Sequence, residues 1–287
     1  MILIADGGST KCDWRVLNDE GKVLYSVVTS GVNPMHATSS DMHHALNGSD
    51  LGTAFKSEIR EIYFFGSGCA AGIGSEKMES FLSSYFNQVD KICVSGDIEG
   101  AVYASSSGPS VVAILGTGSH ACYYDGEEVK FYIPSLGYQV LDIGSGSMIG
   151  RELLRLYFLK KLPQELKIIL EERYEVDVES VKNKLYNSSV SPSSYLASYA
   201  KFAIEHKEWD CMKSILSSSI HWFFDDVLSH YGEELQDVPL YFIGSIASRC
   251  RDIVIGCARK NGYSVGGFVE RPIDGLVDNL GFLRSLV

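Results

Sequence analysis

Residues 2–12 read Ile-Leu-Ile-Ala-Asp-Gly-Gly-Ser-Thr-Lys-Cys, and residues 111–122 read Val-Val-Ala-Ile-Leu-Gly-Thr-Gly-Ser-His-Ala-Cys. Each segment begins as an apolar strand, breaks at glycines beside small hydroxyl residues, and then resumes a strand-like pattern. Glycine lets backbone N–H groups approach a bound anion, and Ser and Thr add neutral hydroxyl donors. The pair predicts a duplicated β-hairpin whose two turns grip one polyphosphate from both sides.

The order of predicted elements also repeats. Apolar strands and amphipathic segments follow the order βββαβαβα in residues 1–107, and the same order recurs in residues 108–287 around a helical insertion at about 163–230. Short apolar strands flanked by helices predict an α/β architecture with a buried mixed sheet in each half and a central cleft. The last helix, from about residue 275, is expected either to stay with the second domain or to pack back on the first.

Composition narrows the classes of partner. The chain has 287 residues, which favours two domains. A formal net charge of -11 argues against nucleic acid or an anionic membrane surface as the main partner, because both require clustered Lys and Arg. The same charge is compatible with ATP, which a few donors and a divalent cation neutralise locally. Seven scattered cysteines, no leader-like segment and no apolar run of membrane-spanning length predict a cytoplasmic protein with reduced thiols.

Three glycine-rich segments resemble the nucleotide motifs of the actin, hexokinase and heat-shock chaperone superfamily. They are Asp6-Gly7-Gly8-Ser9-Thr10-Lys11, Gly116-Thr117-Gly118-Ser119 and Ile243-Gly244-Ser245-Ile246-Ala247-Ser248. More narrowly, the chain resembles the N-acetylglucosamine kinases within the BadF/BadG-type ATPase family, from Ile2 to about Leu286. The resemblance implies two ribonuclease-H-like domains, ATP and Mg²⁺ as cofactors, a small sugar as substrate, and a homodimer.

The resemblance also assigns nucleotide-binding roles. The first turn would hold the β- and γ-phosphates, with Thr10 on a phosphate and Asp6 on Mg²⁺ through water, a role that suits a carboxylate at a strand end. Alternatively, Asp6 is a turn-forming residue and Lys11 a solvated edge lysine. Gly244 and Ser248 would lie against adenosine, unless this segment is an ordinary strand-to-helix turn with a serine cap. The full predicted set is Asp6, Gly8, Ser9, Thr10, Lys11, Gly116, Thr117, Gly118, Ser119, Gly244, Ser245 and Ser248.

Asp97 is the predicted catalytic residue. It follows a strand and precedes a helix of small residues, and the resemblance makes it the general base that accepts the proton of the sugar hydroxyl. The competing interpretation is a helix N-cap. The substrate residues implied by the resemblance are Asn33, Asp97, Leu136, Gly137 and Asp142. Leu136 replaces a tryptophan of animal-type members, and Ile143 replaces a glutamate of many members, so these departures bear on the sugar preference.

Three other functions remain as alternatives. Gly66-Ser67-Gly68-Cys69-Ala70-Ala71 fits the G-x-G-x-x-A pattern of an NAD-dependent oxidoreductase. Cys69 superficially matches a cysteine motif of the BadF-type ATPases that activate dehydratases through an iron-sulfur cluster. A nucleotide-dependent sensor or repressor would need a DNA-binding module ahead of the first strand. We expect instead a kinase that phosphorylates the 6-hydroxyl of N-acetylglucosamine or a related amino sugar, and the sequence leaves open the choice among glucosamine, its N-acetyl form, N-acetylmuramic acid and glucose.

Overall fold

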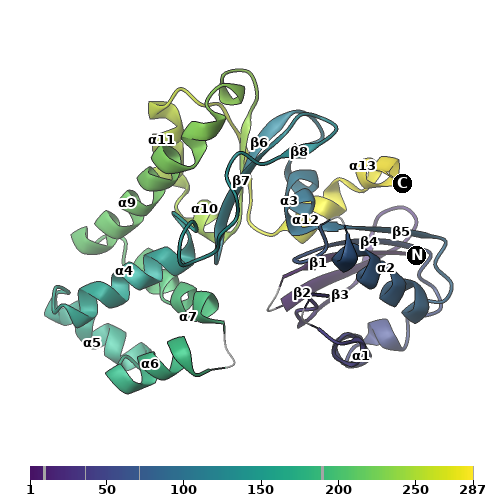
Figure 1. Ribbon diagram of the computed structural model, residues 1–287, viewed down its shortest axis with the longest axis horizontal. Coiled ribbons are helices and arrows are strands. Elements are labelled where there is room, and N and C mark those ends of the chain that lie inside the picture. The colour runs from purple at the N-terminus through teal and green to yellow at the C-terminus, as the bar shows by residue number, and fades with distance from the viewer. Residues whose placement is uncertain (9–10, 36, 71, 189–190, 287) are drawn as a thin grey trace. The chain divides into compact units, whose positions relative to one another are not determined.

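The computed structural model describes residues 1–8, 11–35, 37–70, 72–188 and 191–286, and the chain divides into two compact units (Figure 1). Unit 1 comprises Met1–Gly108 and Arg271–Val287, and unit 2 comprises Pro109–Glu270. The second predicted domain ran to residue 287, whereas in the structure the segment from Arg271 onward groups with unit 1. The chain therefore leaves unit 1 once and returns to it.

Unit 1 is built on a five-stranded mixed sheet in the order β3-β2-β1-β4-β5. The three strands at one side are antiparallel, while β4 and β5 run parallel to β1. The strands are β1 (Ile2–Gly7), β2 (Lys11–Leu17), β3 (Val23–Ser30), β4 (Glu61–Gly66) and β5 (Lys91–Gly96). The helices are α1 (Ser39–Asn47), α2 (Ile73–Tyr85), α3 (Asp97–Ser105), α12 (Pro272–Asp278) and α13 (Leu280–Leu283), with 3₁₀ turns η1 (Asp50–Gly52) and η4 (Arg284–Leu286).

Both faces of the central strands β1 and β4 are buried. Trp14 and Phe64 belong to a core that includes residues of α1 and α2, whereas Ile4 and Phe65 belong to a second core that includes residues of α12 and α13. The returning segment is tightly seated, because a Cβ added to Gly275 of α12 would overlap the carbonyl group of Ala104 in α3. Because these apolar strands are packed on both faces, the end of the sheet at which α3 begins is held in a fixed position.

Unit 2 repeats this sheet. Its order is β10-β9-β6-β7-β8, so β6, β7 and β8 take the places of β1, β2 and β3, and β9 and β10 take those of β4 and β5. Pairing is antiparallel from β6 to β8 and parallel from β6 to β10. The strands are β6 (Ser110–Leu115), β7 (Ser119–Tyr124), β8 (Val129–Lys130), β9 (Leu240–Ile243) and β10 (Val265–Val269). The predicted duplicated hairpin and the predicted α/β fold are confirmed.

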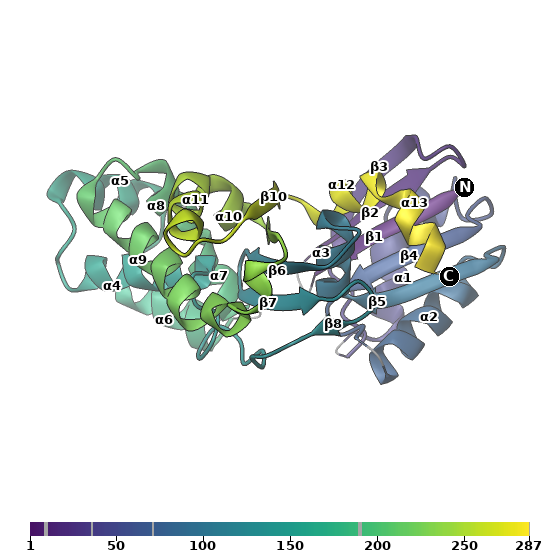
Figure 2. The ribbon, with the colours of Figure 1, turned by 90° about the horizontal axis from the view of Figure 1, so that it is seen from above.

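The helices of unit 2 include the predicted insertion. They are α4 (Gly146–Phe158), α5 (Gln164–Arg173), α6 (Val178–Tyr186), α7 (Pro192–Ser198), α8 (Ala200–Glu205), α9 (Asp210–Asp226), α10 (Ser245–Arg249) and α11 (Arg251–Lys260), with 3₁₀ turns η2 (Leu228–Tyr231) and η3 (Glu234–Gln236). Figure 2 shows α4 to α9 gathered at one end of this unit. Within the described ranges, no helix combines the length and the apolar character needed to cross a membrane.

Two segments are less regular than their apolar patterns predict. The pattern of residues 51–59 predicts a helix, but the segment forms only the 3₁₀ turn η1 followed by turns, because Gly52 and Thr53 are poor helix formers at its start. The pattern of residues 129–133 predicts a strand, but β8 ends at Lys130. Beyond it the Tyr132 N–H donates to the Tyr231 hydroxyl at 3.2 Å, and the two rings stack.

Candidate functional site

The first glycine-rich turn joins β1 to β2. The Gly8 N–H donates to the Lys11 carbonyl at 2.8 Å, which closes the turn, and Ser9 and Thr10 lie outside the described residues. At the end of β1 the chain approaches a ring closely, since a Cβ on Gly7 would lie 2.8 Å from Cζ of Phe64. The absence of a side chain at Gly7 therefore allows the hairpin to pack closely against the Phe64 ring.

Asp6 stands at the carboxyl end of β1 in an environment that resists ionisation. Its pKa is raised to about 6, mainly by burial and also by the nearby carboxylates of Asp13 and Asp97, while Lys11 and Arg271 act in the opposite direction. A divalent cation would relieve the repulsion among these three carboxylates, and hydrated Mg²⁺ prefers carboxylate and water oxygens. The described residues hold no cluster of three or more metal-ligating side chains, so the donors at this end of the sheet fit Mg²⁺ bound through water rather than Mg²⁺ held directly by several carboxylates.

Asp97 lies at the same end of the sheet, as the first residue of α3. It is exposed, and its Oδ2 accepts a hydrogen bond from the Ser67 hydroxyl at 2.7 Å. The Ser67 N–H in turn donates to the Gly7 carbonyl at 2.8 Å. The N-cap position belongs to Gly96, and no side chain caps this helix. The alternative interpretation of Asp97 as an N-cap is therefore wrong.

Asn33 is brought toward Asp97 by the loop that follows β4. A Cβ added to Gly68, which has a φ of +79°, would overlap the Asn33 side-chain oxygen, so the amide lies directly against this loop. The Asn33 oxygen also accepts from the Met35 N–H at 2.9 Å. Lys77 of α2 anchors the asparagine loop by donating to the Pro34 carbonyl at 2.6 Å. The sequence analysis singled out neither Ser67 nor Lys77 for these positioning roles, since only the folded loops bring them to Asp97 and Asn33.

The second turn, in unit 2, is held by the start of α4. The Gly116 N–H donates to the Gly118 carbonyl at 3.0 Å, and the Gly146 and Ser147 N–H groups donate to the Gly116 and Thr117 carbonyls at 2.8 and 3.1 Å. A Cβ on Gly116 would meet no atom within 4 Å, so its backbone borders open space. The start of α4 thus holds the backbone of this turn in place, and the turn is open on the side of Gly116.

Asp142 lies over this second turn. A Cβ on Gly118 would be 2.7 Å from the Asp142 Oδ2, and burial raises the pKa of Asp142 although the Ser119 N–H stabilises its carboxylate. The Ser119 hydroxyl donates to the Ile143 carbonyl at 2.6 Å. The Gly137 carbonyl accepts a hydrogen bond from the Asp142 N–H at 3.3 Å. The structure therefore brings together the predicted phosphate and sugar residues of unit 2.

A narrow pocket adjoins Asp142. Its lining includes Ser119, His120, Ile133, Ser135, Leu141 and Asp142. His120 was not singled out by the sequence analysis, since one histidine in a strand carries no signal. The side chain of Leu136 does not line this pocket and is 57% exposed.

The third motif meets the second turn through backbone contact. β9 pairs with β6, and Gly244 follows it with a φ of +104°. A Cβ on Gly244 would lie 2.5 Å from the Leu115 carbonyl oxygen and 3.3 Å from the Gly116 nitrogen. Gly244 itself occupies the N-cap of α10, so the expected alternative of a serine cap is wrong. Ser245 is exposed, whereas the buried Ser248 hydroxyl has no hydrogen-bond partner among the described residues.

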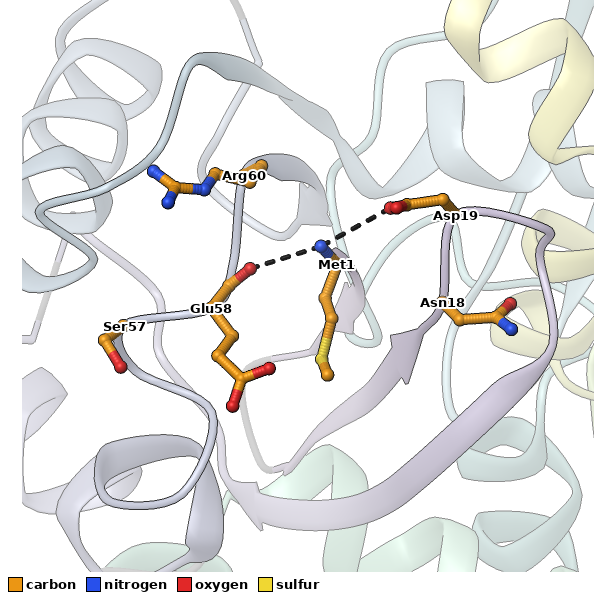
Figure 3. A pocket seen from close by; sticks show the side chains of 6 residues that line it. All are labelled: Met1, Asn18, Asp19, Ser57, Glu58 and Arg60. Carbon is orange, nitrogen blue, oxygen red and sulfur yellow. Dashed lines mark hydrogen bonds and ion pairs between the residues drawn. The ribbon is translucent and has the colours of Figure 1, made fainter.

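A separate open cavity of about 500 Å³ lies elsewhere in unit 1 (Figure 3). It is lined by Met1, Asn18, Asp19, Ser57, Glu58 and Arg60, and the Met1 amine bonds to the Glu58 carbonyl at 3.2 Å and pairs with Asp19 at 3.5 Å. This cavity lies at the start of β1, whereas Asp6 lies near its end. None of the predicted site residues lines it.

The fold and the cysteines argue against two of the alternatives. Dinucleotide-binding sheets are mostly parallel and carry their fingerprint after the first strand, whereas β1, β2 and β3 are antiparallel and Gly66 is the last residue of β4. Cys69 is 0% exposed, and burial raises its pKa to about 12. A cluster shared between subunits requires a thiolate at the surface, and Cys69 is a buried thiol.

Several solved structures resemble this chain over almost its whole length. No protein-family model and no curated protein matches the chain. A proposed N-acetylglucosamine kinase from Porphyromonas gingivalis is 32% identical, with a TM-score of 0.89, and the alignment covers 97% of this chain and 98% of that one. A second, from Chromobacterium violaceum, shares the fold at 16% identity and a TM-score of 0.68, covering 97% and 98%.

A more distant structure shows the breadth of the fold. A ROK family glucokinase from Streptomyces griseus, in complex with glucose and AMPPNP, has a TM-score of 0.58 at 11% identity, covering 99% of each chain. Because the Porphyromonas gingivalis protein is 32% identical over almost the whole of both chains, this chain belongs to the N-acetylglucosamine kinase family.

Proposed function

We propose that this protein transfers the γ-phosphoryl group of MgATP to the 6-hydroxyl of N-acetylglucosamine or a closely related amino sugar. The observation that carries the proposal is the group of polar side chains at the carboxyl end of the unit 1 sheet. There Asp97 is oriented by Ser67, the Asn33 amide lies against the same loop, and Asp6 lies close enough to Asp97 for their charges to interact. Membership of the kinase family supports the same conclusion.

The nucleotide is held mainly by backbone groups. Amides of the Gly8–Lys11 and Gly116–Ser119 turns bind phosphate oxygens, with Thr10 and Thr117 as hydroxyl donors and Lys11 as a nearby cation. Gly244, Ser245 and Ser248 lie along the adenosine. Asp6 would hold Mg²⁺ through water, and the ion would neutralise charge on the phosphates. The remaining chemistry belongs to side chains of the protein.

Asp97 moves the proton. Its Oδ2 is engaged by Ser67, so Oδ1 accepts the proton of the sugar hydroxyl. As that proton leaves, the sugar oxygen forms a bond to the γ-phosphorus, and the bond from this phosphorus to the bridging oxygen breaks to release ADP. Asn33, Gly137 and Asp142 orient the sugar, with Leu136 beside them. Hydroxyl groups paired in this way discriminate strongly, because an unmatched polar group in a closed site is costly.

The proposal is tested by measuring ADP release with glucosamine, N-acetylglucosamine, N-acetylmuramic acid and glucose. We expect kcat/KM for the preferred amino sugar to exceed that for glucose by about tenfold or more, because a matched polar substituent is worth at least a hydrogen bond. ADP release that no sugar stimulates would contradict a kinase function. Gel filtration with light scattering would test the homodimer, which we propose from the resemblance. Cell fractionation would test the cytoplasmic location, which we propose from the pattern of unpaired cysteines.

The raised pKa of Asp6 predicts how the binding of MgATP depends on pH. With a pKa of about 6 in the ligand-free protein, Asp6 is mostly ionised at pH 7 and mostly protonated at pH 5, so we expect about a tenfold weaker association with MgATP at pH 5. Calorimetric titrations across this range measure the effect. In the Asp6→Asn variant binding is weaker throughout, and its pH dependence is reduced.

The same pKa shift has the opposite effect on folding without ligand. Because the pKa of Asp6 is raised above its usual value of 3.8, the folded state binds more protons than the unfolded state between pH 4 and 6. The contribution of Asp6 to stability is therefore most favourable at low pH and is lost as pH rises through 6. Asp6→Asn should raise the melting temperature of the ligand-free protein at pH 8. A lower melting temperature would contradict the unfavourable ionisation.

A further inference from the structure

A second buried carboxylate lies directly beneath the first turn. Asp13 of β2 is in register with Asp6 of β1, and its side chain is only 6% exposed. Like charges directly opposite each other on antiparallel strands repel, and a buried carboxylate is tolerated only when cations and hydrogen bonds compensate it. The environment of Asp13 therefore bears on the charge that the turn presents to a ligand.

Three cations compensate Asp13. The Arg271 Nη2 is 2.9 Å from Oδ1, the Lys11 Nζ is 3.4 Å from Oδ2, and the Arg15 Nη1 is 3.7 Å from Oδ1. Arg15 is also engaged elsewhere, since it donates to the Trp14 carbonyl at 2.9 Å and pairs with Asp274 at 3.5 Å. Arg271 makes the shortest contact, so it is the principal partner of the buried carboxylate.

Arg271 also occupies a special place in the chain. It is the first residue of unit 1 after the chain returns from unit 2, and it immediately precedes α12. This helix packs against β1, β2 and α3, which carry Asp6, Asp13 and Asp97. Asp274 of α12 adds a weaker contact to the Arg271 Nε at 3.8 Å. The guanidinium group thus ties the returning segment to the hairpin of the first turn.

We propose that Arg271 is a positioning residue for nucleotide binding, which acts by pairing with the buried Asp13. This inference rests on the proposed function, because it takes MgATP as the ligand of the turn. With Arg271 in place, Asp13 stays fixed and neutralised, and Asp6 is the carboxylate that meets the ligand. Without Arg271, the charge of Asp13 is poorly compensated and repels both Asp6 and the incoming phosphates.

Calorimetric titration of MgADP into the full-length protein tests the inference through a double-mutant cycle. We expect Arg271→Gln to raise the Kd for MgADP about tenfold, the usual effect of losing a charge-assisted hydrogen bond. In an Asp13→Asn background the same substitution should have little further effect, because its partner is already neutral. Arg271→Lys should restore most of the affinity.

A control is offered by Arg249, whose side chain is about as exposed as that of Arg271 but pairs with the exposed carboxylate of Glu270. Arg249→Gln should leave the Kd for MgADP unchanged. Arg271→Gln with normal affinity but a lower melting temperature would show a purely structural role. An equal loss of affinity with and without Asp13 would show direct contact with the nucleotide; either result overturns the inference.

The same measurements distinguish a failure of the proposed function from a failure of the Arg271 inference. Wild-type protein that binds MgADP but phosphorylates no sugar would refute the kinase proposal and leave the Arg271 cycle intact. Wild-type protein that binds no MgADP would refute both. If Arg271→Gln fails to fold, the comparison is made between Asp13→Asn and the double variant, which removes both charges together. A MgADP affinity of the double variant well below that of Asp13→Asn would overturn the inference.

Discussion

Replacing Asp97 with Asn lowers kcat for sugar phosphorylation by about 10²- to 10⁴-fold, the usual contribution of a general base. The substitution keeps the shape of the side chain and a partner for the Ser67 hydroxyl, which now bonds to Asp97 Oδ2 at 2.7 Å. It removes only the capacity to accept a proton. Association with MgATP should survive or tighten slightly, because Asp97 is one of the charges that raise the pKa of Asp6. Steady-state kinetics and calorimetry together measure these two effects.

Glu99 provides the control for this prediction. It lies in the first turn of the same helix, and its carboxylate folds back against Gly96. Glu99→Gln changes the helix charge by the same amount as Asp97→Asn, so a general electrostatic effect would slow both variants alike. We expect Glu99→Gln to retain most of its activity. Wild-type turnover in Asp97→Asn would exclude Asp97 as the base.

The sequence predicted those parts of the fold that depend on local pattern. Strand, glycine turn and strand recur at residues 2–17 and 111–124, and the two five-stranded sheets follow from that repetition. The returning segment was only an open alternative, because α12 is seated by tertiary contacts such as the close approach of Gly275 to the Ala104 carbonyl. Such an approach depends on tertiary packing, and the glycine alone does not reveal it.

The site was predictable to the extent that motifs mark it. A glycine-rich segment or a strand end lies beside each of Asp6, Asp97 and Asp142. In the structure, each of these carboxylates lies near a polar side chain or a glycine. The residues that hold the surrounding loops and charges in place carry no such signal. Ser67 and Lys77 act through loops that meet only after folding, and Arg271 lies more than 250 residues from Asp13, with which it pairs. Long-range electrostatic partners of this kind cannot be read from periodicity.

Gly244→Ala should destabilise the protein by about 3 kcal/mol, because two separate costs coincide at this position. A φ of +104° is strained for any residue with a side chain, and the added methyl group would lie 2.5 Å from the Leu115 carbonyl oxygen. That oxygen belongs to the backbone of a buried strand, so it has little freedom to move. Relief requires α10 to shift from the second turn, and we therefore also expect weaker association with MgATP. Urea unfolding and calorimetry measure the two effects.

Gly256 supplies a control with the opposite sign. It is exposed in α11, where an added Cβ would meet no atom within 4 Å and the φ is not in the left-handed region. Alanine at such a helix position stabilises by about 0.5–1 kcal/mol, because glycine loses more backbone entropy on folding. The same chemical change thus lowers the free energy of unfolding at one glycine of unit 2 and raises it at another. If Gly244→Ala were as stable as the wild type, the contact between the third motif and Leu115 would be looser than the structure shows, and Gly244 would have no special part in placing the nucleotide.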